Sequence, residues 1–444
     1  MENTQDAPMR RLPPLASLLA LLLAAALPAA DIQEALLHFN ATTDKPALEY
    51  EVGEPITFTV TFGPFAPELP PGTTVHWARR GDDGLREEGS APWTPEAPVT
   101  YTTALNTQGF VWVYFVLVDG QGNRVKQKDG RDVYANCGAA VHPEALQGVP
   151  EPADFDAYWD AQKALLKQVP LKATRTLVKR DEGRGLSIYA VSIDCAGRRP
   201  ATGFLSIPDK AQKEKLPAVA YFHGYGYNAS LFQQPPDFWD QARITFQVNA
   251  HGADLMQPAE YYEEFEKGIR SGNYPYAFDP QQNASPDTAY FHDMVLRVLR
   301  ALEYLKSLPE WNGKDLVVEG GSQGGLQTIW AAALDHDVSL AKPSIPWNCD
   351  AAGQSTFGRE FGSWRIPYAP GLEYFDCIHM APRIQCPVEI TRAGLGDYVC
   401  PPSGVAIFYN RMKCPKTIHW YQGSDHGYYP KGTEIFTLQE PQKP

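Results

Sequence analysis

The segment that most constrains this chain is a glycine-flanked serine between a predicted strand and a predicted helix. A short strand-like run, Asp-Leu-Val-Val-Glu at 315–319, precedes Gly-Gly-Ser-Gln-Gly-Gly at 320–325, and an alanine-rich helical pattern follows at 326–334. The sequence G-x-S-x-G in this setting is typical of a sharp turn that holds the serine in strained backbone geometry. Glycines two residues before and after it let strand and helix pack closely. Ser322 would then stand at the head of a helix, where the dipole favours developing negative charge.

A serine hydroxyl is a poor nucleophile unless a base takes its proton, and two later loops offer the missing partners. Asp397 follows a predicted strand at residues 387–390, and His426 follows one at 417–421. The order Ser, Asp, His is that of α/β-hydrolases, in which these residues follow the carboxyl ends of parallel strands. Considered singly, each residue also suits an ordinary loop. Asp425 is the weaker candidate acid, because adjacent side chains rarely face each other across an imidazole ring.

Two backbone N–H groups are candidates for stabilising the oxyanion of acyl transfer. One belongs to Gln323, directly after the serine, and we place the other at Tyr225, in the loop 223–227 that follows a buried run. His223 could instead be a metal ligand, but no H-E-x-x-H sequence or Cys/His cluster accompanies it. We therefore expect no metal and no cofactor.

Seven cysteines are too few for a disulfide scaffold and show no C-x-x-C spacing. An oxidising compartment would permit a bridge, and Cys386 with Cys414 is the candidate pair. Buried, unpaired thiols throughout are an equally good interpretation.

The N-terminus predicts targeting. Arg10 and Arg11 precede an apolar run at residues 15–27, and small residues continue through Ala30, as in a secretory signal peptide over residues 1–30. The alternative is an uncleaved anchor, but the run is shorter than the roughly 20 residues that a spanning helix needs. No later segment resembles a membrane span, so we expect a secreted or periplasmic protein. Its formal net charge of −13 argues against nucleic acid or an anionic membrane as the partner.

The hydrophobic period divides the rest of the chain into two domains. Within residues 31–141, period-2 alternation at 56–62 and a run at 110–118 that is apolar on both parities predict strands of an immunoglobulin-like β-sandwich. Proline-rich residues 142–153 are predicted to be a linker. Residues 154–444 open with an amphipathic helix, capped at Asp154 or nearby, and then alternate strand and helix patterns. This alternation predicts an α/β domain with a mostly parallel central sheet covered by helices on both faces.

From about residue 150 onward, the chain resembles the acetyl xylan esterase and cephalosporin-C deacetylase family of α/β-hydrolases. The matching segments are Asp-Phe-Asp-Ala-Tyr-Trp at 154–159, His-Gly-Tyr at 223–225, Gly-Gly-Ser-Gln-Gly-Gly at 320–325, Tyr-Phe-Asp at 374–376, Gly-Asp-Tyr-Val-Cys-Pro-Pro-Ser at 396–403 and Asp-His-Gly at 425–427. The resemblance implies a triad of Ser322, Asp397 and His426, with Tyr225 and Gln323 forming the oxyanion hole. It also implies removal of acetyl groups from sugars and small esters without a metal.

Two features depart from that family. Its members usually carry Arg-Gly-Gln after the strand that follows the oxyanion loop, whereas this chain has Asn249-Ala250-His251-Gly252. We therefore expect different packing of this loop. The N-terminal β domain is absent from the best-known members, which are hexamers with inward-facing sites. A homo-oligomer stays open for this chain, but that particular assembly is not implied.

The sequence thus predicts a secreted serine carboxylic-ester hydrolase that removes short acyl groups, above all acetyl, from acetylated sugars or polysaccharide fragments. One alternative is a serine peptidase of the prolyl-oligopeptidase type, although residues 31–141 are too few for its propeller. The other is a non-catalytic binding protein on a degenerate hydrolase scaffold, which a complete set of triad residues argues against.

Overall fold

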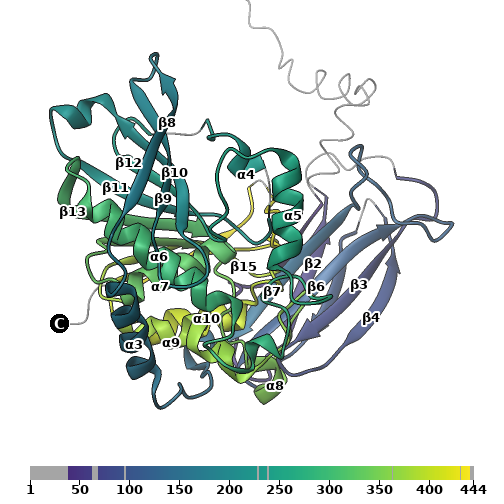
Figure 1. The fold of residues 1–444 in the computed structure, drawn as a ribbon. Helices are drawn as coiled ribbons and strands as arrows, with labels where there is room; N and C mark the ends of the chain where they lie inside the picture. The colour runs from purple at the N-terminus through teal and green to yellow at the C-terminus, as the bar shows by residue number, and fades with distance from the viewer. Residues whose placement is uncertain are drawn as a thin grey trace, which may run out of the picture.

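The computed structural model describes residues 39–62, 69–94, 97–227, 230–237, 240–362, 364–430 and 432–440. A smaller β domain packs beside a larger α/β domain (Figure 1). The predicted signal peptide at residues 1–30 lies outside the described ranges. Within those ranges, no helix has the length and apolar character that crossing a membrane requires.

The smaller domain is a sandwich of two antiparallel sheets. The first sheet has the order β1 (Asn40–Thr43), β2 (Ile56–Thr61) and β5 (Val99–Thr103), and the second has the order β4 (Glu87–Pro92), β3 (Thr74–Gly81), β6 (Gly109–Val118) and β7 (Tyr134–Val141). Buried and half-buried residues alternate along most of β2, as its period-2 pattern predicts. The two-sheet sandwich is therefore present, while its assignment to the immunoglobulin type stays a prediction.

The run at 110–118 is apolar on both parities because β6 has two covered faces. Val111, Val113 and Phe115 point into the core of the sandwich. On the opposite face, the Phe110 ring packs 5.5 Å from Trp420 and the Trp112 ring packs 4.9 Å from Tyr398, both in the larger domain. This sheet therefore separates two hydrophobic cores.

The larger domain is built on a ten-stranded mixed sheet. Six central strands are parallel, in the order β16 (Lys416–Tyr421), β15 (Val388–Gly394), β14 (Leu340–Ser344), β13 (Trp311–Gly321), β11 (Leu216–Phe222) and β12 (Ile244–Asn249). Antiparallel strands extend both edges: β17 (Ile435–Glu440) beside β16, and β10 (Ala201–Pro208), β9 (Leu186–Ile193) and β8 (Ala173–Asp181) beyond β12. The parallel prediction thus holds for the centre of the sheet and not for its edges.

A connected layer of helices packs on this sheet. It contains α3 (Phe155–Lys167), α6 (Tyr290–Ser307), α7 (Gln323–Leu334), α9 (Cys377–Met380) and α10 (Pro402–Arg411). The remaining helices are α4 (Ser230–Gln233), α5 (Ala259–Ile269), α8 (Gly353–Phe357) and the 3-10 turns η1 (Pro143–Ala145), η2 (Asp209–Gln212), η3 (Gln282–Ala284), η4 (Pro370–Phe375) and η5 (Ala381–Arg383). Asp154 lies at the N-cap position of α3, but its carboxylate accepts a hydrogen bond from the Tyr374 hydroxyl instead of capping the helix.

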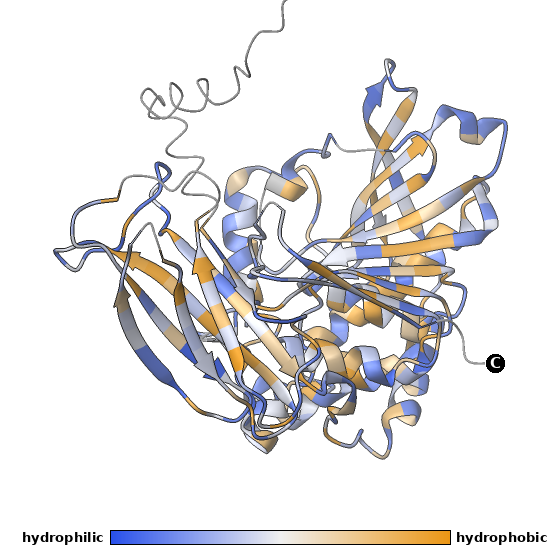
Figure 2. Cartoon of the chain, turned by 180° about the vertical axis from the view of Figure 1, so that it is seen from behind, coloured by the Kyte–Doolittle hydropathy of each residue, from blue (hydrophilic) through white to orange (hydrophobic). Residues whose placement is uncertain are grey.

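The opposite face of strands β13–β16 carries half-exposed charged side chains. Lys342 and Glu389 lie 3.2 Å apart, and His419 approaches Glu389 at 3.6 Å, each side chain being about a third exposed. Glu319 is opposite Lys342 in the strand register and belongs to the same face. A helix lying on this face would cover these groups. The expectation of helices on both faces is therefore wrong for this part of the sheet, whose hydrophilic strand positions are visible from behind in Figure 2.

The sandwich is fixed to the larger domain by buried polar contacts. The Gly138 N–H donates to Gln422 Oε1, and Gln422 Nε2 donates to the Gly138 carbonyl, both at 2.8 Å. A second contact links Tyr134, whose hydroxyl donates to Asp425. Asn136 packs against Gly396, since a Cβ built on that glycine would lie 2.7 Å from the Asn136 Cβ. The sandwich therefore contacts residues directly adjacent to Asp397 and His426.

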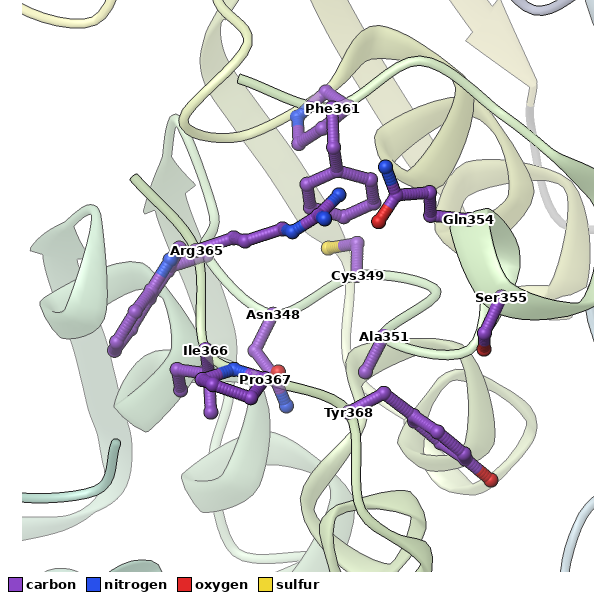
Figure 3. A pocket seen from close by; sticks show the side chains of 12 residues that line it. Asn348, Cys349, Ala351, Gln354, Ser355, Phe361, Arg365, Ile366, Pro367 and Tyr368 are labelled. Carbon is purple, nitrogen blue, oxygen red and sulfur yellow. The ribbon is translucent and has the colours of Figure 1, made fainter. Parts of the chain in front are cut away.

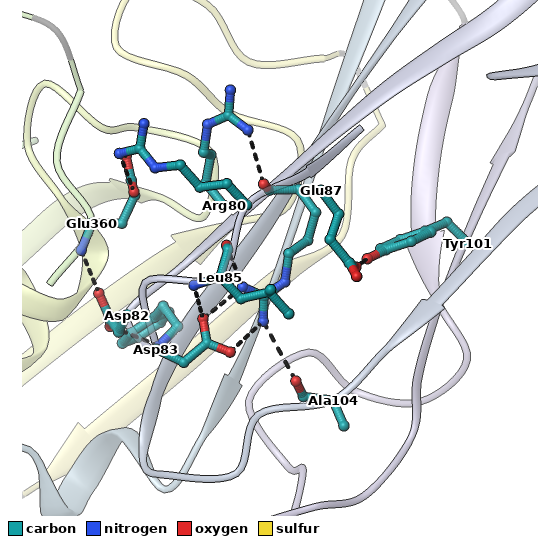
Figure 4. Close-up of polar contacts among 11 residues, drawn as sticks. Arg80, Asp82, Asp83, Leu85, Glu87, Tyr101, Ala104 and Glu360 are labelled. Carbon is teal, nitrogen blue, oxygen red and sulfur yellow. Dashed lines mark hydrogen bonds and ion pairs between the residues drawn. The ribbon is translucent and has the colours of Figure 1, made fainter. Parts of the chain in front are cut away.

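A third contact fixes the segment around Glu360, shown in Figure 4. Arg86 donates to Glu360 at 2.9 Å, and the Glu360 N–H donates to Asp82 at 3.1 Å. The other carboxylate oxygen of Asp82 accepts from the Phe110 N–H at 2.8 Å. Burial raises the pKa of Asp82 to about 6, although both backbone bonds oppose the shift. The segment that follows α8 is thus attached to the sandwich.

Replacement of Gly138 by alanine should loosen the contact between the two domains. A Cβ at this position would lie 2.4 Å from the Leu395 carbonyl oxygen, so the backbone of β7 or that of the Leu395 loop has to move. We expect Gly138→Ala to lower the free energy of unfolding by about 1–3 kcal/mol, as overpacking typically does. Gly268→Ala is the matched control, because its Cβ would meet nothing within 4 Å in helix α5. Chemical denaturation measures both, and equal stability of the two variants would contradict the interface described here.

Candidate active site

The turn between β13 and α7 holds Ser322 in the geometry that its glycines predict. Ser322 has φ 58° and ψ −119°, a positive φ that L-residues rarely adopt. A Cβ on Gly324 would lie 2.1 Å from the Phe222 carbonyl oxygen, and one on Gly320 would lie 2.5 Å from the same atom. The Ser322 N–H donates to the Ser344 carbonyl at 2.9 Å. The turn is therefore held from both neighbouring strands, with no room for side chains at the flanking glycines.

Three residues from separate loops form one hydrogen-bonded chain. His426 Nε2 lies 3.0 Å from Ser322 Oγ, and His426 Nδ1 lies 3.0 Å and 3.2 Å from the two carboxylate oxygens of Asp397. Asp397 is fully buried, and one of its oxygens accepts the N–H groups of Val399 and Cys400. Asp425 is turned away and accepts from the Tyr134 hydroxyl and its own loop.

This arrangement has the parts that acyl transfer requires. The imidazole of His426 lies between an oxygen that can lose a proton and a buried carboxylate that can stabilise the resulting imidazolium. The His426 side chain is 29% exposed, so a substrate and water can reach it from one side. The chain of contacts can therefore move a proton away from Ser322.

The loop that contains Tyr225 lies beside the serine. A Cβ on Gly224 would come 4.0 Å from the Ser322 Cβ. The backbone N–H groups of Tyr225 and Gln323 make no hydrogen bond to any described residue. Both predicted donors are therefore free to bind a ligand oxygen beside Ser322.

Tyr276 connects the two donor segments, and sequence reasoning missed it. Its hydroxyl accepts from the Gly226 N–H at 2.7 Å and donates to Gln323 Oε1 at 2.9 Å. Its ring stacks on Tyr225 at 4.3 Å between centroids. Burial raises the pKa of Tyr276 far above the ordinary value, so the phenol stays protonated and keeps its donor. No spacing signal marks this residue, because it reaches the site from a loop far along the chain.

His223 forms the other side of the same loop. Its Nε2 accepts the Ala250 N–H at 3.1 Å, so the ring proton is on Nδ1, which donates to the Gly224 carbonyl at 2.8 Å. Burial lowers the pKa of His223 to about 4. The His251 ring of the unusual 249–252 segment packs 5.6 Å from His223 and 4.7 Å from Tyr276. This segment thus supports the donor loop from behind.

The described residues contain one trio that could in principle ligate a metal: Asp397, Cys400 and His426, whose ligand atoms lie within 4.8 Å of one another. Both ring nitrogens of His426 are already hydrogen-bonded to Asp397 and Ser322, so the observed trio is arranged as part of the proton chain. His223, whose ring nitrogens bond to backbone groups, is not among these residues.

All seven cysteines are free thiols in this structure. The candidate bridge between Cys386 and Cys414 is therefore not formed. The interpretation as buried, unpaired thiols fits six of them, and Cys195 is half-buried. Burial raises the pKa of Cys386 to about 12 and that of Cys195 to about 11, which keeps these thiols protonated and unreactive.

Comparisons with known proteins match the part of the chain that carries this site. The acetyl xylan esterase family model matches residues 146–357 and 369–438, more than half of the chain. Acetyl esterase Axe7A of Xylanibacter ruminicola is 29% identical over 284 residues, which are 62% of this chain and 63% of that relative. The chain thus spans less than two thirds of this curated relative.

Two solved structures are similar over 65% of this chain. An acetyl xylan esterase from Paenibacillus sp. R4 is 29% identical, with a TM-score of 0.52 and 94% of that chain covered. Acetyl xylan esterase 1 from Thermoanaerobacterium sp. JW/SL YS485 is 22% identical, with a TM-score of 0.52 and 93% covered, which shows the fold alone. The resemblance inferred from the motifs is confirmed.

Removal of the Tyr276 hydroxyl should impair the site without unfolding the protein. Tyr276→Phe leaves the Gly226 N–H and Gln323 Oε1 unpaired, so both donor segments lose a shared anchor. We expect about a tenfold loss of kcat/KM on p-nitrophenyl acetate, the effect of roughly 1.4 kcal/mol. Tyr274→Phe is the control, since Tyr274 is 45% exposed. Full activity of Tyr276→Phe would show that the bridge is dispensable.

The low pKa of His223 should make the free energy of unfolding fall as the pH is lowered. Its pKa of about 4 lies below the ordinary 6.5, so the unfolded chain binds more protons between these values, and stability falls as pH drops from 6.5 toward 4. Glutamine can keep both hydrogen bonds without titrating. Wild type should therefore lose roughly 2 kcal/mol more than His223→Gln between pH 7 and pH 5. Urea unfolding of both proteins measures this difference, and parallel pH profiles would contradict the shift.

Proposed function

Because this chain belongs to the acetyl xylan esterase family, a family of carboxylic-ester hydrolases, we propose that it is a secreted serine esterase that removes acetyl groups from acetylated sugars. The observation that carries the proposal is the hydrogen-bonded chain from Ser322 through His426 to Asp397. The N-terminal leader predicted over residues 1–30 supports secretion.

In the proposed reaction, Ser322 Oγ attacks the carbonyl carbon of the ester while His426 Nε2 takes the hydroxyl proton. Collapse of the tetrahedral intermediate breaks the bond to the sugar oxygen, which receives that proton from His426 and leaves as the alcohol. Water then attacks the acetyl-serine with His426 again as base, releasing acetate and restoring the serine. Asp397 stays ionised and orients the imidazole. All of these steps use protein groups and water.

The oxyanion of both intermediates would be bound by the N–H groups of Tyr225 and Gln323. Neither N–H has an acceptor among the residues that the structure describes, and Gln323 is also the first residue of α7, where the helix dipole favours negative charge. Removing one such donor in other hydrolases costs about 2.7–4 kcal/mol of transition-state stabilisation. The bridge through Tyr276 would keep the two donors at a fixed separation.

Two features support an acetylated saccharide chain or fragment over other substrates. The name of the curated relative, an acetyl esterase, points to the acyl group. The net charge of −13 disfavours polyanionic partners such as nucleic acid. The peptidase alternative is disfavoured because the N-terminal strands form a two-sheet sandwich in place of a propeller.

Replacement of the nucleophile tests the proposal. Ser322→Ala should reduce hydrolysis of p-nitrophenyl acetate by at least about a thousandfold and abolish labelling by a fluorophosphonate, because among the described residues only the Ser322 hydroxyl is hydrogen-bonded to His426 Nε2. Ser90→Ala, on an exposed strand of the sandwich, is the control that should behave as wild type.

The substrate class is tested on the same preparations. Wild type should release acetate from acetylated xylo-, manno- or cello-oligosaccharides faster than it hydrolyses butyrate or ferulate esters. Equal acetate-ester hydrolysis by Ser322→Ala would refute the mechanism. Turnover of a prolyl p-nitroanilide by an enzyme inactive on acetate esters would favour the peptidase.

A further inference from the structure

A pocket of about 420 Å³ lies next to the catalytic loops and is not used by the proposed reaction (Figure 3). It is formed by the segment that follows β14, by Phe361 and by residues 365–368, with Pro401 also in its lining. Both β14 and β15 end at this edge of the sheet, so the pocket and the triad share it.

Two hydrogen bonds connect the pocket wall to the reacting groups. The backbone N–H of Trp347, a lining residue, donates to the Ser322 carbonyl at 3.2 Å. On the other side, the Cys400 N–H donates to the carboxylate of Asp397 at 3.0 Å, and Pro401 directly follows it. The pocket wall is therefore hydrogen-bonded directly to the Ser322 backbone and to Asp397, which makes the pocket a candidate site for the units next to an acetylated sugar.

Arg365 supplies an unpaired positive charge in this pocket. Its side chain extends across the pocket in Figure 3, with the guanidinium toward the side that carries Phe361 and Gln354. Within the described part of the chain, Arg365 makes no hydrogen bond or ion pair. The neighbouring carboxylates are already occupied, Asp350 by Arg359 and Glu360 by Arg86.

A second donor lacks a partner in the same pocket. The side-chain amide nitrogen of Asn348 is buried and makes no hydrogen bond. Buried donors are normally satisfied, so an unpaired amide and an unpaired guanidinium lining one pocket indicate a ligand with acceptor oxygens. A carboxylate has acceptors only, and the planar fork of arginine matches its two oxygens.

Aromatic rings beside the pocket suit a sugar ring. The rings of Trp347 and Trp364 stack with centroids 5.3 Å apart, and Trp364 is 39% exposed. Tyr368, which lines the pocket, is 37% exposed. Aromatic faces bind the C–H faces of sugars, while the polar donors bind their oxygens.

We propose that this pocket is a subsite for a carboxylate-bearing sugar, a uronic acid unit that neighbours the acetylated unit. The inference rests on the proposed function for the position of the acetyl group. Arg365 would bind the carboxylate through two parallel N–H bonds, and Asn348, whose amide points toward Pro367 and Tyr368 in Figure 3, would donate to a hydroxyl or ring oxygen of the sugar. The net charge of −13 opposes an anionic ligand, so its binding would depend on the local positive charge of Arg365.

The kinetic test compares two forms of one acetylated xylo-oligosaccharide with a glucuronic acid branch: the free carboxylate and the carboxyl-reduced sugar. Wild type should show about a tenfold higher kcat/KM for the acid form, and Arg365→Met should abolish this preference. Arg198→Met is the control, because it removes an exposed positive charge elsewhere and should keep the wild-type preference. Equal rates of wild type on the two forms would overturn the subsite.

A binding test gives an answer even if the proposed esterase activity fails. The deacetylated glucuronic acid-branched oligosaccharide is titrated into wild type and Arg365→Met by calorimetry, alongside its carboxyl-reduced form. We expect about tenfold tighter binding of the acid form by wild type, weakened by salt and lost in the variant. Indifference to the carboxylate, or tighter binding of a sulfated analogue, would overturn the assignment. If wild type is inactive on p-nitrophenyl acetate but still binds the acid form more tightly, the proposed esterase function is refuted and the subsite is not.

Discussion

The site depends on the close approach of the Phe222 carbonyl to Gly320 and Gly324. Only residues without a Cβ allow β11, β13 and α7 to come this near, and this packing forces Ser322 into a positive φ. The same approach brings the loop after β11 alongside the serine, as the proposed oxyanion role of the Tyr225 and Gln323 N–H groups requires. One steric constraint thus positions Ser322, the N-terminus of α7 and the loop after β11 together.

The other half of the triad depends on a second contact, with the sandwich. Gln422 and Gly138 exchange two buried hydrogen bonds, and Asn136 packs against Gly396. These contacts adjoin the loops that carry Asp397 and His426. The family match begins only at residue 146, yet the preceding domain touches both loops and also holds Glu360, near the pocket with Arg365. The sandwich is therefore integral to the architecture around the site.

The positions of Ser322, Asp397 and His426 could be predicted from local sequence. Each follows a recognisable strand, and each is a residue type that acyl transfer requires in that order. The antiparallel edges escaped prediction: β8 and β17 are largely exposed, so no buried face gives them a clear period. Tyr276 escaped because its role comes from a long-range contact. Helices on both faces of the sheet were expected from the alternation of strands and helices. That alternation cannot show that the face with Glu319, Lys342 and Glu389 is left without a covering helix. Free cysteines could not be told from a bridge, because pairing depends on tertiary distance.

The central claim is that Ser322 Oγ accepts the acyl group and that His426 activates it by taking its proton. Its most direct measurement is peptide mass mapping after reaction with a p-nitrophenyl carbamate, whose carbamoyl-enzyme hydrolyses slowly. The account predicts one p-nitrophenol released per active chain and one carbamoyl group, located on Ser322. A carbamoyl group on another residue, or full remaining esterase activity after stoichiometric modification of Ser322, would contradict it.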